Sequence, residues 1–426
     1  MLEWRNNATR RLLAVRHSAG PLSSEHPVTI VIPDALRFFI LGGCVGALAW
    51  LCGDGPLLSL WILLLPIAWG RTRTRLSASL LMAGYYLVSA CGMLAGVASF
   101  FGEEKSVAFV IALWAAFGLW STLPFALLWS KNKRFLPWSF VAALVLAMVP
   151  PLAVIGTFNP LMVSGILFPS LGWAGLLLTM ATVVALGYRR LFPMLACLVI
   201  ALVANALAAW GEVRVPDNWK GVDTHFDGIR NGGVADAGQI LGSMRRIEWL
   251  KDYAKTVPAK SVTVLPETIL GPMNALAWVS LEETERSLRA QGSVILAGAE
   301  LPQGDDQYEN VVLVLGAHIG EDRKAVQNIP VPIAMWKPWS NTGAVGDVFG
   351  VKNRIHVNGE PIAVLVCYEQ LLPYAVLLAM ASSPNVLVAV SNVHWARGTL
   401  VPIIQRRTVH AYARLFGVPL VQAANG

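Results

Sequence analysis

Apolar residues are distributed in two different ways along this chain of 426 residues. Before residue 210 they form long, almost uninterrupted stretches, whereas afterwards short apolar runs alternate with charged segments. A helix that crosses a bilayer needs about 20 apolar residues, whereas a buried strand needs only roughly 4–8. The pattern therefore predicts a helical membrane domain over 35–210, followed by an α/β domain over 211–426.

Seven stretches in the first half predict membrane-spanning helices. They cover about 35–53, 56–70, 76–101, 106–130, 136–155, 162–187 and 191–210. The second stretch is short and is also compatible with a re-entrant segment. Hydrophobic residues make up 55% of the chain, charged residues only 14%, and the mean hydropathy is +0.56. These values favour an integral membrane protein over a bundle of buried soluble helices.

The charges between these stretches predict an orientation. Basic residues follow the second, fourth and sixth stretches: Arg71, Arg73, Arg75, Lys131, Lys133, Arg134, Arg189 and Arg190. The other connections are acidic or uncharged. Lys and Arg stay on the cytoplasmic side of a membrane. Residues 1–34 should therefore form a cytoplasmic segment, and seven crossings place residues 211–426 on the opposite side.

The net charge belongs to the membrane half. Up to Trp210 there are 14 Lys and Arg against 6 Asp and Glu, and afterwards 19 against 20, so charges of +8 and −1 sum to the formal +7. The α/β half lacks the basic surface typical of nucleic-acid binding, so we expect no nucleic-acid partner.

The second half alternates strand-like and helix-like patterns. The strand-like runs are Ser261–Leu265, Val294–Gly298, Val311–Leu315, Ile362–Val366, Val386–Val390 and Val418–Val421; the helical patterns cover about 236–257, 274–290, 371–381 and 400–415. Such alternation predicts a sheet structure covered by helices. In such folds, reactive side chains gather where the strands end.

Three strand ends or loops in this half carry reactive groups. Cys367 ends an apolar strand and is the only cysteine outside the membrane half. Glu267 directly follows another strand, and Lys337 lies between Trp336 and Trp339. A carboxylate can take the thiol proton, and the thiolate can then form an acyl-thioester. The ammonium and the backbone N–H of Tyr368 can stabilise the oxyanion. The alternative is an inert buried cysteine.

These residues resemble a known catalytic set. Leu265-Pro266-Glu267, Lys337 and Cys367-Tyr368-Glu369 resemble the Glu-Lys-Cys triad of the nitrilase, or carbon–nitrogen hydrolase, superfamily. Tyr308-Glu309-Asn310 and Ser391-Asn392 with Trp395 resemble its flanking blocks. The resemblance implies an αββα sandwich. It also implies that Glu267 is the base, Lys337 stabilises the oxyanion, Cys367 is the nucleophile, and Glu369 organises the site.

A multi-span half followed by this domain resembles apolipoprotein N-acyltransferase. Among proteins of this architecture, the modest length and loose motifs resemble a family of membrane proteins of plasmid conjugal transfer. The resemblance implies a multi-pass protein of the bacterial inner membrane with a periplasmic C-terminal domain. It implies a phospholipid or other acyl donor, an amine or water as acceptor, and conjugation-complex proteins as partners. No cofactor and no metal are expected.

The chain also departs from the acyltransferase pattern. Val345 stands where that pattern has a further Glu, and the nearest acid is Asp347. No acidic residue follows Glu369. These losses leave open a second hypothesis, a catalytically degenerate assembly factor of a conjugation or envelope complex.

Other side chains near the motifs are assigned only general roles. Trp336, Trp339, His394 and Trp395 are candidates for lining the substrate site. The pattern favours a solvated helix face for four basic residues, with the binding of phospholipid headgroups as the alternative: Arg397, Arg406, Arg407 and Arg414.

Overall fold

The computed structural model describes residues 33–92, 94–96, 106–211, 213–227, 237–304 and 306–426. It divides into two units, 1–33 and 34–426, and only the second is described below. The predicted cytoplasmic segment 1–34 therefore lies almost entirely outside the described residues.

Helices make up the first half of the described chain, and each predicted apolar stretch contains helical structure. They are α1 (Asp34–Trp50), η1 (Pro56–Leu63), α2 (Leu64–Trp69), α3 (Arg75–Ser89), α5 (Val107–Leu128), α6 (Leu136–Leu146), η2 (Leu152–Ile155), η3 (Pro160–Val163), α7 (Ser164–Leu167), α8 (Gly172–Tyr188) and α9 (Leu191–Trp210). Among the described residues, α5 and α9 are each long and apolar enough to cross a membrane. The segment from η3 to α8, bent by 116°, adds a third span if it is counted as one. That the chain crosses the membrane seven times remains a prediction.

Glycines let α1 and α3 approach each other closely. A Cβ atom at Gly42 would lie 1.8 Å from the carbonyl oxygen of Leu81, and one at Gly84 would lie 2.1 Å from that of Phe39. Small residues at helix contacts allow the backbones to pack directly, as is common between membrane helices. The two helices therefore form a tightly packed pair.

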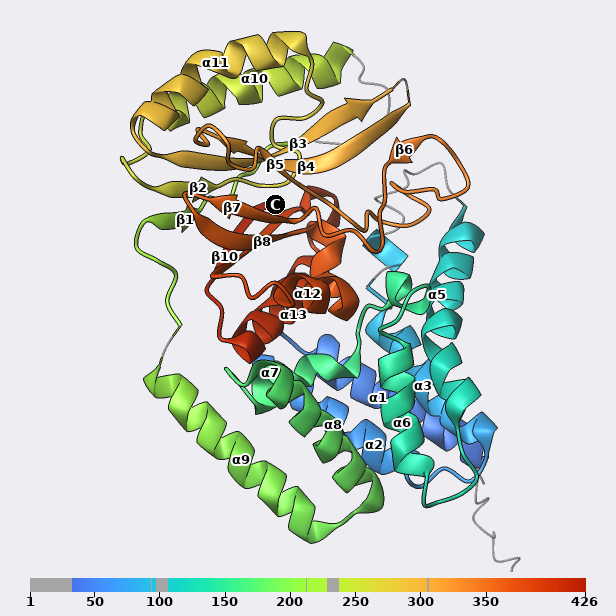
Figure 1. The fold of residues 1–426 in the computed structure, drawn as a ribbon. Helices are drawn as coiled ribbons and strands as arrows, with labels where there is room; N and C mark the ends of the chain where they lie inside the picture. Colours follow the sequence, from blue (N-terminus) through green and yellow to red (C-terminus); the bar gives the residue numbers. More distant parts are fainter. Residues whose placement is uncertain (1–32, 93, 97–105, 212, 228–236, 305) are drawn as a thin grey trace, which may run out of the picture. The chain divides into compact units, whose positions relative to one another are not determined.

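The second half contains two sheets (Figure 1). The first has the order β1 (Trp219–Gly221), β2 (Val262–Val264), β3 (Val294–Gln303), β4 (Gln307–Leu315) and β5 (Lys324–Val326), with β6 (Gly343–Ala344) also paired to β4. The second has the order β10 (Leu420–Asn425), β9 (Val386–Asn392), β8 (Glu360–Val366) and β7 (Arg354–Val357). β1, β2 and β3 pair in parallel, as do β8, β9 and β10. All six predicted strands are present, whereas the short β1, β5, β6 and β7 were not predicted.

Helices cover the outer faces of both sheets. α10 (Ala237–Ala254) and α11 (Ala275–Ala290) lie over the first sheet, and α12 (Pro373–Met380) and α13 (Val401–Phe416) lie over the second (Figure 1). Apolar strand residues such as Val264, Leu296, Val364 and Val388 are buried between the sheets. Because each sheet also buries its outer face under helices, the half is the αββα sandwich that the resemblance implies.

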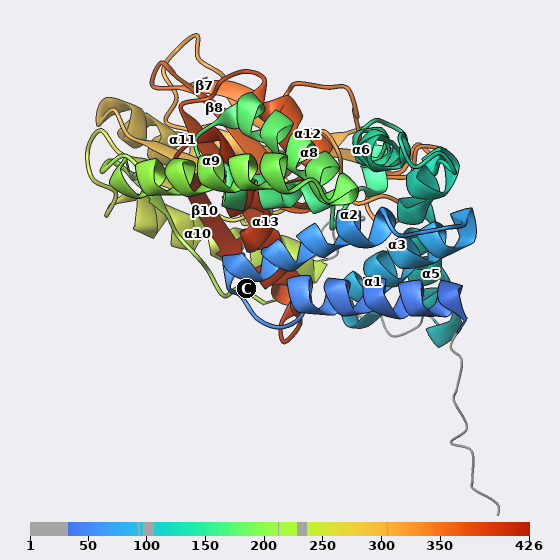
Figure 2. The ribbon, with the colours of Figure 1, turned by 90° about the horizontal axis from the view of Figure 1, so that it is seen from below.

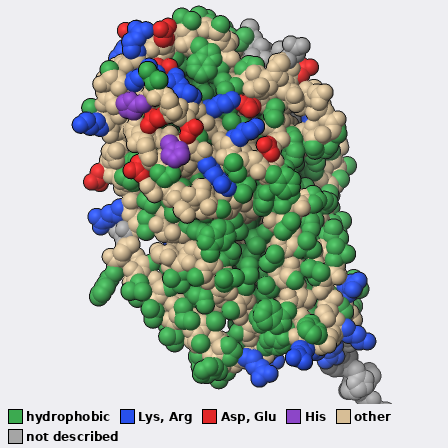
Figure 3. Space-filling view, in the orientation of Figure 1, with side chains coloured by type: hydrophobic (Ala, Val, Ile, Leu, Met, Phe, Trp, Pro, Cys, Tyr) green, Lys and Arg blue, Asp and Glu red, His purple; other side chains and the backbone are tan. Residues whose placement is uncertain are grey.

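The α12–α13 layer also packs on the helical half. One hydrophobic core contains Trp50 and Tyr85 from the first half, and Leu365 and Tyr412 from β8 and α13. Seen from below in Figure 2, the helices of the first half lie in front of α13 and β10. Hydrophobic side chains dominate the surface over the helical half, whereas acidic and basic side chains mix over the sandwich (Figure 3).

Candidate active site

Cys367 occupies a strained turn between a strand and a helix. β8 ends at Val366, and the short helix η4 (Cys367–Leu371) begins at the cysteine itself. Its φ angle is +48°, a left-handed conformation that costs free energy in a residue with a Cβ atom. Gln405 of α13 donates a hydrogen bond of 3.0 Å to the Cys367 carbonyl. The surrounding structure therefore holds a conformation that the cysteine does not favour by itself.

Glu267 contacts Cys367 from the other sheet. The carboxylate is fully buried and follows β2 after Leu265 and Pro266. It accepts hydrogen bonds of 2.8 Å from the side-chain amide of Asn310 and from the backbone N–H of Asn392. The Cys367 thiol hydrogen-bonds to the same carboxylate. The acid and the thiol that the sequence singled out are thus brought together from β2 and β8.

The environment keeps the Cys367 thiol protonated. Burial raises its pKa well above the ordinary value, and the Glu267 charge and hydrogen bond raise it further. The backbone N–H groups of Asn392 and Tyr368 act in the opposite direction, because they donate to the sulfur. A thiol with a raised pKa needs a base at the moment of attack, and the only carboxylate hydrogen-bonded to it among the described residues is Glu267.

Tyr368 and Glu369 fix the segment that follows the cysteine. The Tyr368 hydroxyl donates a hydrogen bond of 2.9 Å to the carbonyl of Val154, in the helical half. The buried carboxylate of Glu369 accepts from the backbone N–H groups of Asn328, Ile329 and Val366 at 2.9–3.1 Å. Burial raises the pKa of Glu369 to about 7, although the three N–H donors lower it. Glu369 therefore ties η4 to the 328–329 loop.

Lys337 lies on a loop that is attached to β4. The loop folds back through hydrogen bonds from the N–H groups of Met335 and Trp336 to the Val331 carbonyl, and β6 then pairs with β4. The Lys337 side chain is half-buried. Among the described residues its ammonium makes no hydrogen bond or ion pair with Glu267 or Cys367. The hydrogen bond at the site thus joins Glu267 to Cys367 and does not include Lys337.

Asp347 lies apart from the buried carboxylates. Its side chain is exposed, and its carboxylate is 3.9 Å from the ammonium of Lys352. Its backbone N–H donates to the carbonyl of Asn328, the residue whose own N–H binds Glu369. Asp347 therefore contacts the loop that supports Glu369 through its backbone, while its carboxylate faces Lys352.

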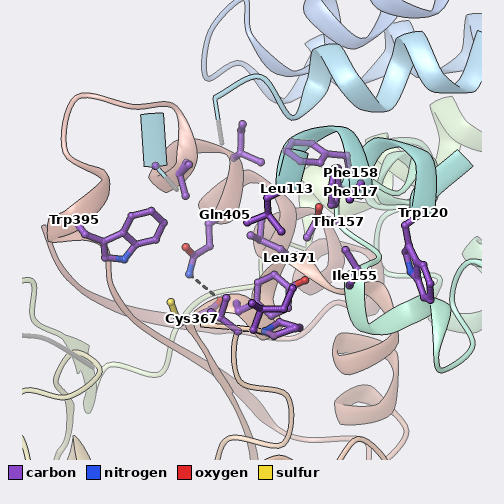
Figure 4. Close-up of a pocket in the computed structure, with 18 residues that line it drawn as sticks. Leu113, Phe117, Trp120, Ile155, Thr157, Phe158, Cys367, Leu371, Trp395 and Gln405 are labelled. Carbon is purple, nitrogen blue, oxygen red and sulfur yellow. Dashed lines mark hydrogen bonds between the residues drawn. The ribbon is translucent and has the colours of Figure 1, made fainter. Parts of the chain in front are cut away.

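A cavity of about 280 Å³ lies where the helical half meets the sandwich, and Cys367 is part of its wall. Its lining is almost entirely apolar. It includes Leu113, Phe117 and Trp120 of α5, Phe158, Val331, Ile333, Tyr368, Leu371, Trp395 and Ile404. Figure 4 shows Trp395 near Cys367 and Trp120 on the opposite side.

Of the four predicted substrate-lining residues, only Trp395 borders this cavity. Trp336 packs on Gly346, Trp339 is exposed, and a ring nitrogen of His394 hydrogen-bonds to the Asn392 side chain at 3.0 Å. The apolar side chains of the first half take the place that these residues were expected to occupy.

Two relatives match nearly the whole chain. It is 34% identical over 415 residues to the conjugal transfer protein TraB of Agrobacterium fabrum (strain C58), with 91% of each chain covered. It is 32% identical over 402 residues to the probable conjugal transfer protein TraB of Sinorhizobium fredii (strain NBRC 101917 / NGR234), covering 89% of this chain and 95% of the relative. The chain belongs to the TraB family of conjugal transfer proteins. No protein-family model matches it.

Solved structures similar to this TraB-family chain cover about half of it. An amidase from Nesterenkonia sp. is 14% identical, with 49% of this chain and 75% of the amidase covered and a TM-score of 0.31. A carbon–nitrogen hydrolase from Helicobacter pylori G27 is 16% identical, with 49% and 73% covered and a TM-score of 0.32. The assignment of the sandwich rests on the two sheets and four helices described above.

Two buried polar residues at the site, Asn310 and Gln327, were not predicted to have a role there. The Asn310 amide donates to both Glu267 and the side chain of Gln327, and Gln327 in turn donates to the carbonyl of Val366. This buried chain links the carboxylate to the strand that ends at Cys367. Asn310 lies in a motif that resembles the superfamily, whereas nothing in the local sequence marks Gln327.

Proposed function

We propose that this chain is a membrane-bound acyltransferase or amidase of the nitrilase type that forms an acyl-thioester on Cys367 in plasmid conjugal transfer. The observation that carries the proposal is the hydrogen bond between the Cys367 thiol and the Glu267 carboxylate, beside an apolar cavity. The conjugal role is supported by the names of the two relatives.

The reaction follows from the groups around the sulfur. Glu267 accepts the thiol proton as the sulfur attacks the donor carbonyl, and a tetrahedral oxyanion forms. The N–H of Tyr368 donates to this oxyanion, and we propose that Lys337 approaches it when substrate is bound. Glu267 then returns the proton to the leaving group. An amine or water attacks the thioester, transfers a proton to Glu267, and releases the Cys367 thiolate, which regains the proton.

The donor should be a phospholipid or another lipid with an acyl chain. The cavity lining offers almost no polar groups, so its binding free energy would come from burial of apolar surface. The cavity also lies against α5, which is one of two helices in the described part of the chain that are long enough to cross a membrane. We propose that the chain spans the bacterial inner membrane several times, with the sandwich on the periplasmic side, as the basic connections of the first half indicate.

The test is a search for the thioester. Purified full-length protein is incubated with an activated acyl ester, and the adduct is located by intact mass and peptide mapping. We expect one acyl group on Cys367, released by hydroxylamine, and much slower formation of this adduct in Glu267→Gln. Loss of the nucleophile in Cys367→Ala should reduce turnover at least about 10³-fold. A wild-type protein that stays unmodified refutes the proposal.

A second function is favoured by Lys337, whose ammonium makes no hydrogen bond or ion pair with Glu267 or Cys367 among the described residues. In this case the sandwich is an inactive scaffold that binds other conjugation proteins. A plasmid-transfer assay separates the two functions. Normal transfer with Glu267→Gln, Lys337→Ala and Cys367→Ala supports the scaffold, whereas loss of transfer in all three supports the enzyme.

A further inference from the structure

Arg407 is buried, although the pattern of α13 placed it on a solvated helix face. Its exposed fraction is 8%, whereas its neighbour Arg406 is exposed. A guanidinium removed from water needs hydrogen-bond acceptors for its N–H groups. The buried Arg407 side chain must therefore find its acceptors on neighbouring elements.

The acceptors come from the helical half. Arg407 donates to the carbonyl of Ala49 at 2.8 Å, to the carbonyl of Gly53 at 3.1 Å, and to the Ser59 hydroxyl at 2.9 Å. Its guanidinium also lies over the ring of Trp50, 5.7 Å from the centroid. Ala49 and Trp50 form the end of α1, where unpaired carbonyls carry partial negative charge. Among the described residues, no carboxylate lies within ion-pairing distance of Arg407.

Two contacts connect this cluster to the candidate active site. Gln405, two residues before Arg407 on α13, donates to the Cys367 carbonyl. On the other side, the Trp50 ring packs edge-on against Phe158 with centroids 5.2 Å apart, and Phe158 lines the cavity. Arg407 therefore lies one residue contact away from two parts of the cavity wall, since Gln405 binds Cys367 and Trp50 packs on Phe158.

We propose that Arg407 is a positioning residue: by fastening α13 to the end of α1, it holds Gln405 against Cys367 and keeps the thiol in its buried geometry. The inference deepens the proposed function, since it assigns control of the nucleophile to a contact between the two halves. The close packing of α13 on the helical half supports it, because a Cβ atom at Gly165 of α7 would lie 1.7 Å from the Ala411 carbonyl oxygen.

The test uses a small alkylating reagent and not an acyl donor. Full-length protein in detergent is treated with iodoacetamide from pH 6 to pH 10, and modification of the Cys367 peptide is followed by mass spectrometry. The other four cysteines are distinguished by their own peptides. The variants are Arg407→Met, which removes the charge at similar length, Arg407→Lys, and the exposed control Arg406→Met.

We expect the wild-type thiol to show no plateau below pH 10. In Arg407→Met, water gains access to a loosened turn, so the midpoint should fall towards about 8.5, the value of an ordinary thiol. Arg407→Lys keeps a cation at the end of α1 and should partly restore the wild-type profile. Arg406→Met should match the wild type. A wild-type profile in folded Arg407→Met overturns the proposal.

A double-mutant comparison tests the route through Gln405. The milder pair Arg407→Lys and Gln405→Leu is used, so that the variants fold. If both act on Cys367 through the same contact, the change in alkylation rate of the double variant should not exceed that of the more affected single variant. Multiplied effects overturn the proposed route. Because alkylation needs no acyl transfer, this result stands whether or not Cys367 forms a thioester.

Discussion

Replacing Glu267 with glutamine separates two opposite effects of this carboxylate on Cys367. The negative charge and the hydrogen bond of Glu267 raise the pKa of the thiol, so their removal should lower it. The same replacement removes the group that takes the proton during attack. The variant should therefore contain more thiolate at a given pH and yet acylate more slowly.

The magnitudes follow from the contacts of the side chain. General base catalysis contributes about 10²–10⁴-fold, so the acylation rate should fall by that factor. In the wild type both carboxylate oxygens accept hydrogen bonds, from Asn310 and from the Asn392 N–H. The NH₂ group of glutamine cannot accept a hydrogen bond, so either the Asn310 amide or the Asn392 N–H loses its acceptor. This loss should reduce the free energy of unfolding by about 1–3 kcal/mol.

Two measurements on the same protein are needed. The rate of acyl-ester adduct formation is measured at pH 7, and the alkylation of Cys367 is followed against pH. Glu248→Gln, at an exposed position of α10, is the matched control and should leave both unchanged. The reasoning is refuted if Glu267→Gln acylates at the wild-type rate, or if its thiol titrates at a higher pH than the wild type.

Three further predictions concern stability and specificity. Burial raises the pKa of Glu369 from 4.5 to about 7, so the folded state binds the carboxyl proton more tightly than the unfolded state does. The free energy of unfolding should therefore fall by roughly 3 kcal/mol as the pH rises from about 4.5 to about 7. Equal pH dependence of thermal unfolding in the wild type and Glu369→Gln would contradict this. Phe117→Ala enlarges the cavity and should reduce the free energy of unfolding by about 3–5 kcal/mol, while acylation shifts towards longer esters in a chain-length series; an unchanged preference argues against an acyl-chain site. Gly165→Ala forces α7 away from Ala411 and should destabilise the protein by about 1–3 kcal/mol or more, whereas Gly92→Ala, with no atom within 4 Å of its added Cβ, should have little effect in the same denaturation assay.

Local patterns were sufficient to predict the longer strands and to place Glu267 and Cys367 at the ends of two of them. The runs that became β2, β8 and β9 are continuous and apolar because both faces of these strands are buried, and this gives a strong local signal. Glu267 and Cys367 were found because reactive groups gather where such strands end. β1, β5, β6 and β7 contain two to four residues each and, unlike the equally short β2, do not lie within a longer apolar run.

Features that depend on distant partners were not predictable from local sequence. The acceptors of Arg407 lie about 350 residues earlier in the chain, so its periodic position suggested a solvated face instead. The cavity was not predictable for the same reason, because its wall combines segments far apart in the sequence: α5, residues 155–158 and α13. Trp336, Trp339, His394 and Trp395 were predicted to line the site because they are near the motifs in sequence. The residues that line the cavity are instead determined by packing between the helical half and the sandwich.

The core shared by α13 and the helical half bears on how the molecule can be studied. A fragment that begins after α9 would expose to water the apolar surfaces of α12 and α13 that pack on the helical half. Exposed patches of this kind lead to aggregation, so such a fragment should be insoluble even though its strand pairing is intact. The chain should therefore be expressed, purified and assayed as one piece.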